Sequence, residues 1–185
     1  MDPAIVVAIG VFVLLLFVFG MYNRLVRARN HCDEAWHNID TELKRRYDLI
    51  PNLVNCVKGY AKYEREVLER VTQLRAECVA NTGSPESQAA SENKLVRALA
   101  ALLVRVERYP ELKASANFLQ LQEELVNTED RIQAARRFYN GNVRENNNLV
   151  EMFPTSLIAA LCGFRRREFF EVEDIRERHT PSAAL

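Results

Sequence analysis

An uncharged apolar run near the N-terminus constrains the fold of this chain more than any other feature. The run AIVVAIGVFVLLLFVFGM extends from Ala4 to Met21 without a charged or strongly polar side chain. As an α-helix rising about 1.5 Å per residue it measures roughly 27 Å, close to the thickness of a bilayer's hydrocarbon core. A cleaved signal peptide would show a basic start, a shorter apolar run and a small-residue cleavage site. The run therefore predicts a retained transmembrane anchor.

The charges that flank this run predict its orientation. Arg24, Arg27 and Arg29 follow it, whereas Asp2 is the one charged side chain before it. Lys and Arg accumulate on the cytoplasmic side of membrane helices. We therefore expect a single-pass protein of a bacterial inner membrane, with the bulk of the chain in the cytosol.

Beyond the anchor, the sequence predicts an all-α protein. The 185 residues contain only six Gly and six Pro, and apolar residues recur at three- and four-residue steps. Trp36 is in register with Ile39 and Leu43, so we expect it to be buried between helices. The expected helices run from the membrane to about Ile50 with a break at Asp48–Pro51, over Leu53–Cys78, from Ser84–Pro85 to about Tyr109, and on to Phe153, where Pro154 stops the last one.

Helices of this length joined by short turns are typical of an antiparallel bundle. The predicted fold is thus an N-terminal transmembrane helix that continues into an antiparallel bundle of long helices. The predicted domains are an N-terminal tail and anchor over residues 1–21, a cytosolic bundle over 22–153, and a short apolar helix with a charged tail over 154–185.

The order of several sequence blocks is similar to that of the LemA family. The blocks include YNRLV from Tyr22, LKRRYDLIPNLV from Leu43, RYPELKA from Arg108, ARRFYN from Ala134 and MFP from Met152. The resemblance spans residues 22–171 and implies a single membrane helix carrying a cytosolic helical bundle. It also implies a link to membrane organisation, because one branch of the family is associated with formation of magnetosome membranes. Asn146-Asn147 departs from the family pattern, which tends to repeat Tyr-Asn there.

Composition and motifs argue against several classes of protein. The 25 basic and 25 acidic residues give no net charge, so we expect no nucleic-acid partner. Four scattered cysteines resemble buried apolar residues in a reducing compartment. His31, Asp33, Glu34 and His37 crowd one stretch, but their spacing fits a solvated helix face better than a metal site. With no phosphate-binding loop or catalytic motif present, we predict no enzyme activity, no metal and no cofactor.

A basic cluster, Lys44, Arg45 and Arg46, leaves two interpretations open. It lies about 37 Å from the membrane if the helix is continuous, too far to contact the same bilayer. It forms either ion pairs inside the bundle with acidic residues of the last long helix, or a contact for another molecule.

Two further segments suggest contacts outside the chain. Arg165, Arg166 and Arg167 follow the apolar piece Leu157–Leu161 and precede Phe169 and Phe170, a composition that suits contact with anionic lipid at a membrane surface. The alternative is that this tail packs on the bundle with its phenylalanines in the core.

The second segment, LVRALAALLVRV from Leu95, is apolar over about 240° of a helix, more than a core-facing helix requires. Either this helix is central in the bundle, or Val96, Ala100, Leu103 and Val104 form a self-association face.

These features predict a function without catalysis. The leading hypothesis is a membrane-anchored scaffold that forms homo-oligomers at the inner face of the membrane and organises or remodels it, with membrane lipid as a partner. The alternative is a regulatory adaptor for a membrane-embedded protein such as a protease or transporter.

Overall fold

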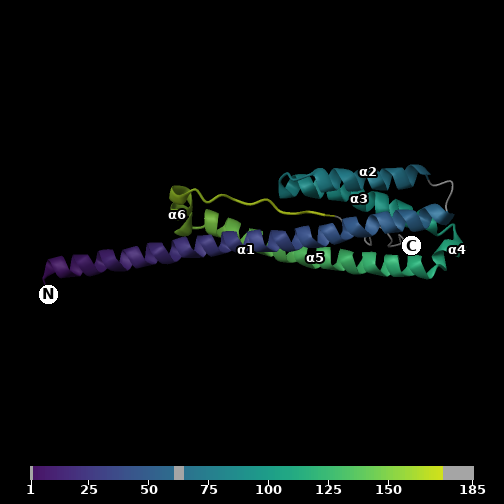
Figure 1. Cartoon of the computed structure of the whole chain (residues 1–185). Helices are drawn as coiled ribbons and strands as arrows, with labels where there is room; N and C mark the ends of the chain where they lie inside the picture. The colour runs from purple at the N-terminus through teal and green to yellow at the C-terminus, as the bar shows by residue number, and fades with distance from the viewer. Residues whose placement is uncertain (1, 61–64, 173–185) are drawn as a thin grey trace, which may run out of the picture. The chain divides into compact units, whose positions relative to one another are not determined.

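The computed structural model describes residues 2–60 and 65–172, which form six α-helices and no β-strand (Figure 1). The helices are α1 (Pro3–Tyr60), α2 (Arg65–Ala80), α3 (Pro85–Val106), α4 (Pro110–Lys113), α5 (Ala116–Glu151) and α6 (Thr155–Cys162). This confirms the predicted fold class, a long apolar N-terminal helix followed by packed helices. The part of the predicted tail beyond residue 172 lies outside the described residues.

The described residues form two compact units. The anchor unit comprises residues 2–36 and 138–168, and the bundle unit comprises residues 37–60, 65–137 and 169–172. Helices α1 and α5 each contribute residues to both units. No loop interrupts α1 between the apolar run and the residues that the bundle unit buries.

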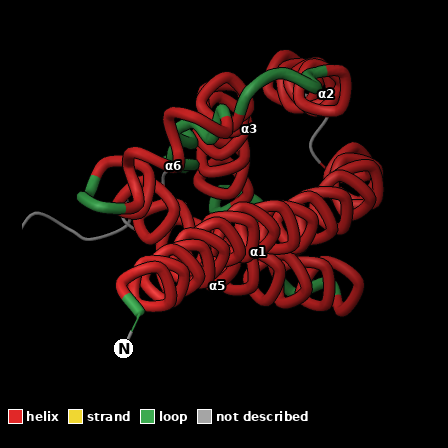
Figure 2. The backbone as a smooth tube through the Cα atoms, turned by 90° about the vertical axis from the view of Figure 1, so that its left-hand side faces the viewer, coloured by secondary structure: helices red, strands yellow, loops and turns green. Residues whose placement is uncertain are grey.

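In the anchor unit, the apolar run forms a helical segment that the chain does not cover. Its large apolar side chains from Ile5 to Phe19 are each 40–65% exposed. The segment is long and apolar enough to cross a membrane. Burial begins at Leu25, which clusters with Ala28 of α1, Leu149 of α5 and Ile158 of α6. Figure 2 shows α6 beside α1 in this unit.

The bundle unit has a conventional apolar core between long helices. The second part of α1, then α2, α3 and the first part of α5 follow one another up and down, and α2 and α3 lie side by side (Figure 1). Core residues recur with helical spacing, as expected from the sequence. They include Ile39, Leu43, Ile50, Leu68, Val71, Leu74, Leu95, Leu99, Leu102, Phe118, Leu125 and Ile132.

The predicted break at Asp48–Pro51 is wrong, because α1 continues through Pro51 to Tyr60. A proline inside a helix removes a backbone hydrogen bond and costs about 3 kcal/mol. Here Ile50, Leu53 and Val57 are all buried on one face around it. Burying each such side chain contributes roughly 1.5–3 kcal/mol, so packing outweighs the lost hydrogen bond.

The predicted helix over Leu53–Cys78 is also wrong at its start, because α1 runs to Tyr60 and α2 begins at Arg65. Three other helix boundaries follow local signals in the sequence. The Ser84 hydroxyl accepts a hydrogen bond from the Ser87 N–H at the start of α3, and Pro85 occupies the first helical position. Pro110 begins the short helix α4. Helix α6 ends at Gly163, whose φ of 72° lies in the left-handed region that favours glycine.

Candidate functional site

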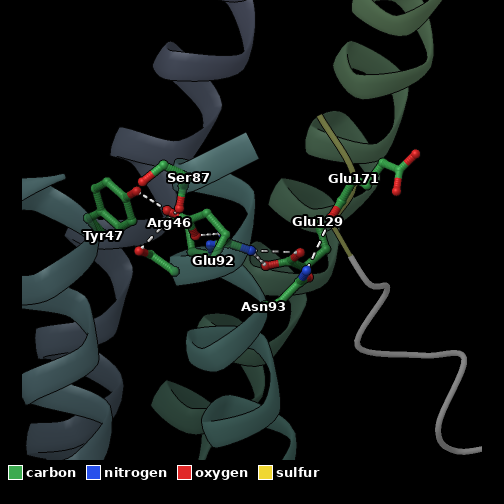
Figure 3. Close-up of polar contacts among 8 residues, drawn as sticks. Arg46, Tyr47, Ser87, Glu92, Asn93, Glu129 and Glu171 are labelled. Atoms are coloured by element: carbon green, nitrogen blue, oxygen red, sulfur yellow. Dashed lines mark hydrogen bonds and ion pairs between the residues drawn. The ribbon is translucent and has the colours of Figure 1, made fainter. Parts of the chain in front are cut away.

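A network of buried charged groups joins three helices of the bundle unit (Figure 3). It consists of Arg46 and Tyr47 of α1, Glu92 of α3 and Glu129 of α5, and we call it the Arg46 network. Arg46 is 0% exposed, and its Nη1 donates to the Glu129 carboxylate oxygens at 2.9 and 3.1 Å. Its Nη2 donates to Glu92, which also accepts a hydrogen bond from the Tyr47 hydroxyl. The network therefore ties α1 to both α3 and α5.

The electrostatics of the Arg46 network favour a structural role. Burial disfavours a charged guanidinium, but the carboxylates of Glu129 and Glu92 outweigh it and raise the pKa of Arg46 above its ordinary value. Burial, followed by the negative charge of Glu92, raises the pKa of Tyr47. Both groups thus keep their protons at neutral pH and use them in buried hydrogen bonds. This arrangement fixes the position of the helices, and both side chains are buried away from solvent.

The three residues of the basic cluster have different surroundings in the structure. Arg46 pairs with Glu129 of the last long helix, which confirms ion pairing inside the bundle. Lys44 and Arg45 are exposed and form local pairs with Asp40 and Glu42 of the same helix.

Sequence reasoning missed Glu92, although the sequence contains a signal for it. Glu92 interrupts the buried face of α3 between Ala89 and Leu95. A charged residue at an apolar position predicts a buried partner of opposite sign, because an isolated charge there is costly.

The thiols of the described residues divide into buried and accessible ones. Cys32 and Cys78 are buried, Cys56 is intermediate and Cys162 is exposed. Burial, and then the Glu92 carboxylate, raises the pKa of Cys78 to about 12. Burial also raises the pKa of Cys32, although Arg167 opposes the shift. Because the thiolate is the reactive form, neither buried thiol is suited to nucleophilic chemistry.

The His31 stretch contains polar side chains with partners of their own. His31 Nδ1 lies 3.6 Å from Glu34, and both side chains are largely exposed. Asp33 forms an ion pair with Arg167, with 2.8 Å between the Asp33 Oδ1 and Arg167 Nη1 atoms. Among residues 2–60 and 65–172, no three His, Cys, Asp or Glu side chains converge as a set of metal ligands.

Two buried asparagines of α5 hold the extended segment that follows α6. The Asn147 amide donates to the Arg167 carbonyl at 2.9 Å and accepts from the Arg167 N–H at 2.8 Å. Asn146 donates to the Arg165 carbonyl at 3.4 Å. We call these bonds the asparagine clasp. Asn146 stands where the family pattern tends to have Tyr, whereas Asn147 keeps the Asn of that pattern.

The structure places the predicted lipid-contact residues in different surroundings. Arg165 and Arg166 are exposed, and Arg166 pairs with Glu151. Arg167 is half-buried and pairs with Asp33. Phe169 is partly exposed, whereas Phe170 is fully buried and the chain itself covers its ring. Within the bundle unit, Asn93 donates to the Glu171 carbonyl at 3.1 Å (Figure 3), so the stretch after Phe169 packs on the bundle.

The predicted self-association face is also divided. Val96 is buried in the core, and Ala100 and Leu103 are partly buried. Val104 is 49% exposed, as expected for a residue on an outer face.

Trp36, expected to be buried, is partly exposed and packs against Tyr139 with ring centroids 5.3 Å apart.

Comparison with known proteins adds a family relationship to this geometry. The sequence profile of the LemA family matches residues 35–184. The chain is 29% identical to Protein LemA of Metamycoplasma hominis, over 97% of this chain and 81% of that protein. It is 25% identical to the magnetosome protein MamQ of Magnetospirillum gryphiswaldense, over 90% of this chain and 71% of the relative. Magnetosome protein MamQ 2 of Paramagnetospirillum magneticum is 24% identical with the same coverage.

Proposed function

Because this chain belongs to the LemA family, we propose that it is a scaffold protein that assembles at the inner face of a bacterial membrane. The family and the fold make the chain a membrane-associated helical protein. The magnetosome proteins among its relatives are consistent with such a role.

One observation carries the proposal, namely the continuity of α1. A single helix of 58 residues begins in the uncovered apolar run and ends among the buried residues of the bundle unit. The helix that anchors the chain is therefore also a core helix of its folded domain. Such a design suits a protein whose task is to hold a bundle at a membrane.

The arginines after the apolar run support the proposed side of the membrane. Arg24, Arg27 and Arg29 are all exposed, and the positive-inside bias counts charges within 15–20 residues of a membrane helix. This bias favours a cytosolic bundle unit.

Self-assembly is proposed through the exposed part of α3 around Val104. Anchoring in one membrane plane raises the effective concentration of such faces, so that weak contacts suffice. To test this, the mass of the full-length particle is measured in mild detergent. The unchanged chain is compared with the Val104→Glu and Val79→Glu variants. Val79 on α2 is 54% exposed, which makes it a matched control.

We expect the unchanged chain and Val79→Glu to form oligomers and Val104→Glu to form a smaller, folded particle. A monomer at high concentration for the unchanged chain would contradict the scaffold proposal. An unchanged oligomer for Val104→Glu would contradict this face.

A polar groove of the bundle unit supports the second candidate, a regulatory adaptor. The groove has a volume of about 660 Å³ and lies between the end of α1 and the start of α5. Asn52, Asn55, Asn117 and Gln120 contribute amides that can bind the backbone of an extended peptide. An adaptor would be extracted from the membrane with one stoichiometric partner, and Asn55→Leu together with Gln120→Leu would release that partner.

A further inference from the structure

Helix α6 of the anchor unit exposes apolar side chains. Leu157 is 58% exposed and Leu161 is 86% exposed. Phe153, in the turn before the helix, is 79% exposed, and Met152 beside it is 62% exposed. Four large apolar side chains thus face outward from one short stretch of the chain.

The opposite face of α6 is apolar as well. Ile158 and Ala159 pack into the cluster that contains Leu25, Ala28 and Leu149. The helix sequence TSLIAALC contains no charged residue. A helix that packs one face on its own protein and leaves the other in water carries polar residues on the second face. A helix that is apolar on both faces needs an apolar medium on the outer one.

The place of α6 along α1 indicates what that medium is. An apolar groove of about 460 Å³ is lined by Ile158 and Cys162 of α6 and by residues 15–22 of α1. The lining residues of α1 are Leu15, Leu16, Val18, Phe19 and Tyr22. They lie on the last two turns of the apolar run and on the residue that follows it, about 10 Å of helix. Helix α6 therefore lies at the level where the anchor leaves the hydrocarbon core.

Aromatic and basic side chains surround the same level. The Tyr22 and Phe164 rings pack edge-on with their centroids 5.8 Å apart. The Arg29 guanidinium lies 5.6 Å from the centre of the Phe164 ring. The exposed residues Arg24 and Arg165 add positive charge. Aromatic rings and arginines are typical of the region of lipid headgroups, where the arginines attract anionic lipid.

From this arrangement we propose that α6 and the Met152–Phe153 turn are a second membrane contact, inserted into the interface of the same leaflet from which the anchor emerges. Leu157, Leu161 and Phe153 reach the acyl chains, and acyl chains also occupy the groove between α6 and α1. The contact rests on the proposed membrane anchor and is independent of self-assembly.

Cys162 provides a natural reporter for this contact, because it is exposed, lies on α6 and lines the groove. The full-length Cys56→Ser chain is labelled at Cys162 with the fluorophore NBD, since Cys32 and Cys78 are buried. It is then reconstituted in phosphatidylcholine–phosphatidylglycerol vesicles at less than one chain per vesicle. We expect blue-shifted emission and strong quenching by lipids that carry a nitroxide near the top of the acyl chain, since interfacial helices lie about 5–10 Å deep.

Two controls with one accessible cysteine each, made with Cys56 and Cys162 replaced by Ser while the buried Cys32 and Cys78 are kept, calibrate the measurement. A label at Phe12→Cys in the apolar run reports the bilayer interior. A label at Glu34→Cys, an exposed position about 20 Å further along α1 than Met21, reports water. Quenching at Phe12→Cys without quenching at Cys162 would overturn the second contact and leave the anchor intact. Blue-shifted emission at Cys162 that nitroxide lipids do not quench would also overturn it, because protein would then cover α6.

A variant tests the leucines directly. Leu157→Glu with Leu161→Glu places two charges on the outward face of α6, so we expect the helical circular dichroism to be kept and the nitroxide quenching at Cys162 to be lost. Val104→Glu, a change of the same kind in the bundle unit, should leave the quenching unchanged. Quenching that persists in the double-Glu variant would overturn the proposal.

Discussion

The anchor unit and the bundle unit place their unusual residues in opposite positions. The bundle unit buries charge, because Arg46, Glu92 and Glu129 lie in its core. The anchor unit exposes apolar surface, on the apolar run from Ile5 to Phe19 and at Leu161 of α6. Both arrangements are uncommon in a soluble protein, where charged residues stay at the surface and large apolar patches are covered.

The difference between the units shows what each one needs for stability. In the bundle unit, the buried charges are paired within the chain, because Arg46 binds the carboxylates of Glu92 and Glu129, although its Nε has no hydrogen-bond partner among the described residues. In the anchor unit, the outer apolar side chains find no partner in the described residues, and a membrane can supply one.

Removing Arg46 should produce the largest loss of stability. In Arg46→Ala, the carboxylates of Glu92 and Glu129 remain buried without their cation, which costs about 3–5 kcal/mol. Replacing Arg46, Glu92 and Glu129 together by Met or Leu removes the uncompensated charge, so we expect this triple variant to melt near the unchanged chain. Thermal melting followed by circular dichroism measures both. Equal destabilisation in the two variants would show that packing, and not charge, dominates at this site.

Trp36→Ala should have a smaller effect in the anchor unit. The indole is partly exposed and packs against Tyr139, so its loss should cost about 2 kcal/mol, less than the 3–5 kcal/mol of a fully buried aromatic residue. Trp36→Phe retains a ring against Tyr139 and serves as the control. Chemical denaturation measures the loss, and an unchanged midpoint for Trp36→Ala would show that the ring contact does not stabilise the unit.

Opening the asparagine clasp should act locally. Asn147→Ala removes both hydrogen bonds to the Arg167 backbone and leaves its N–H and carbonyl to find other partners, at a cost of about 1–3 kcal/mol. We expect faster amide hydrogen exchange around residues 165–168. Asn148→Ala, at an exposed neighbouring position of α5, is the control. Unchanged exchange in Asn147→Ala would contradict the role of the clasp.

Much of the fold was predictable from local sequence. The apolar run, the Ser84 cap and the regular spacing of Ile39, Leu43 and Ile50 are signals within a few residues of the structures that they specify. Pro51 shows where such reasoning fails, because a local breaker is overridden by the burial of residues around it. The helix continues because its neighbours supply packing energy that a single-sequence pattern does not display.

The residues of the candidate site were harder to predict, because they depend on distant parts of the chain. Arg46 belongs to a basic cluster that is visible in the sequence, but its partner Glu92 lies 46 residues away on another helix. The asparagine clasp joins Asn147 to a backbone twenty residues later, and backbone groups have no sequence signature. The apolar segment LVRALAALLVRV of α3 predicted a second apolar face. Val96 contributes to the core, however, because the bundle covers more than one side of that helix.

We propose that α1 crosses the membrane and continues into a bundle on the cytosolic side. To test this topology, one accessible cysteine, Thr82→Cys, is placed in the exposed loop between α2 and α3, with Cys56 and Cys162 replaced by Ser. Intact cells are treated with a membrane-impermeant maleimide before and after permeabilisation. We expect labelling only after permeabilisation, and labelling of Thr82→Cys in intact cells would contradict a cytosolic bundle.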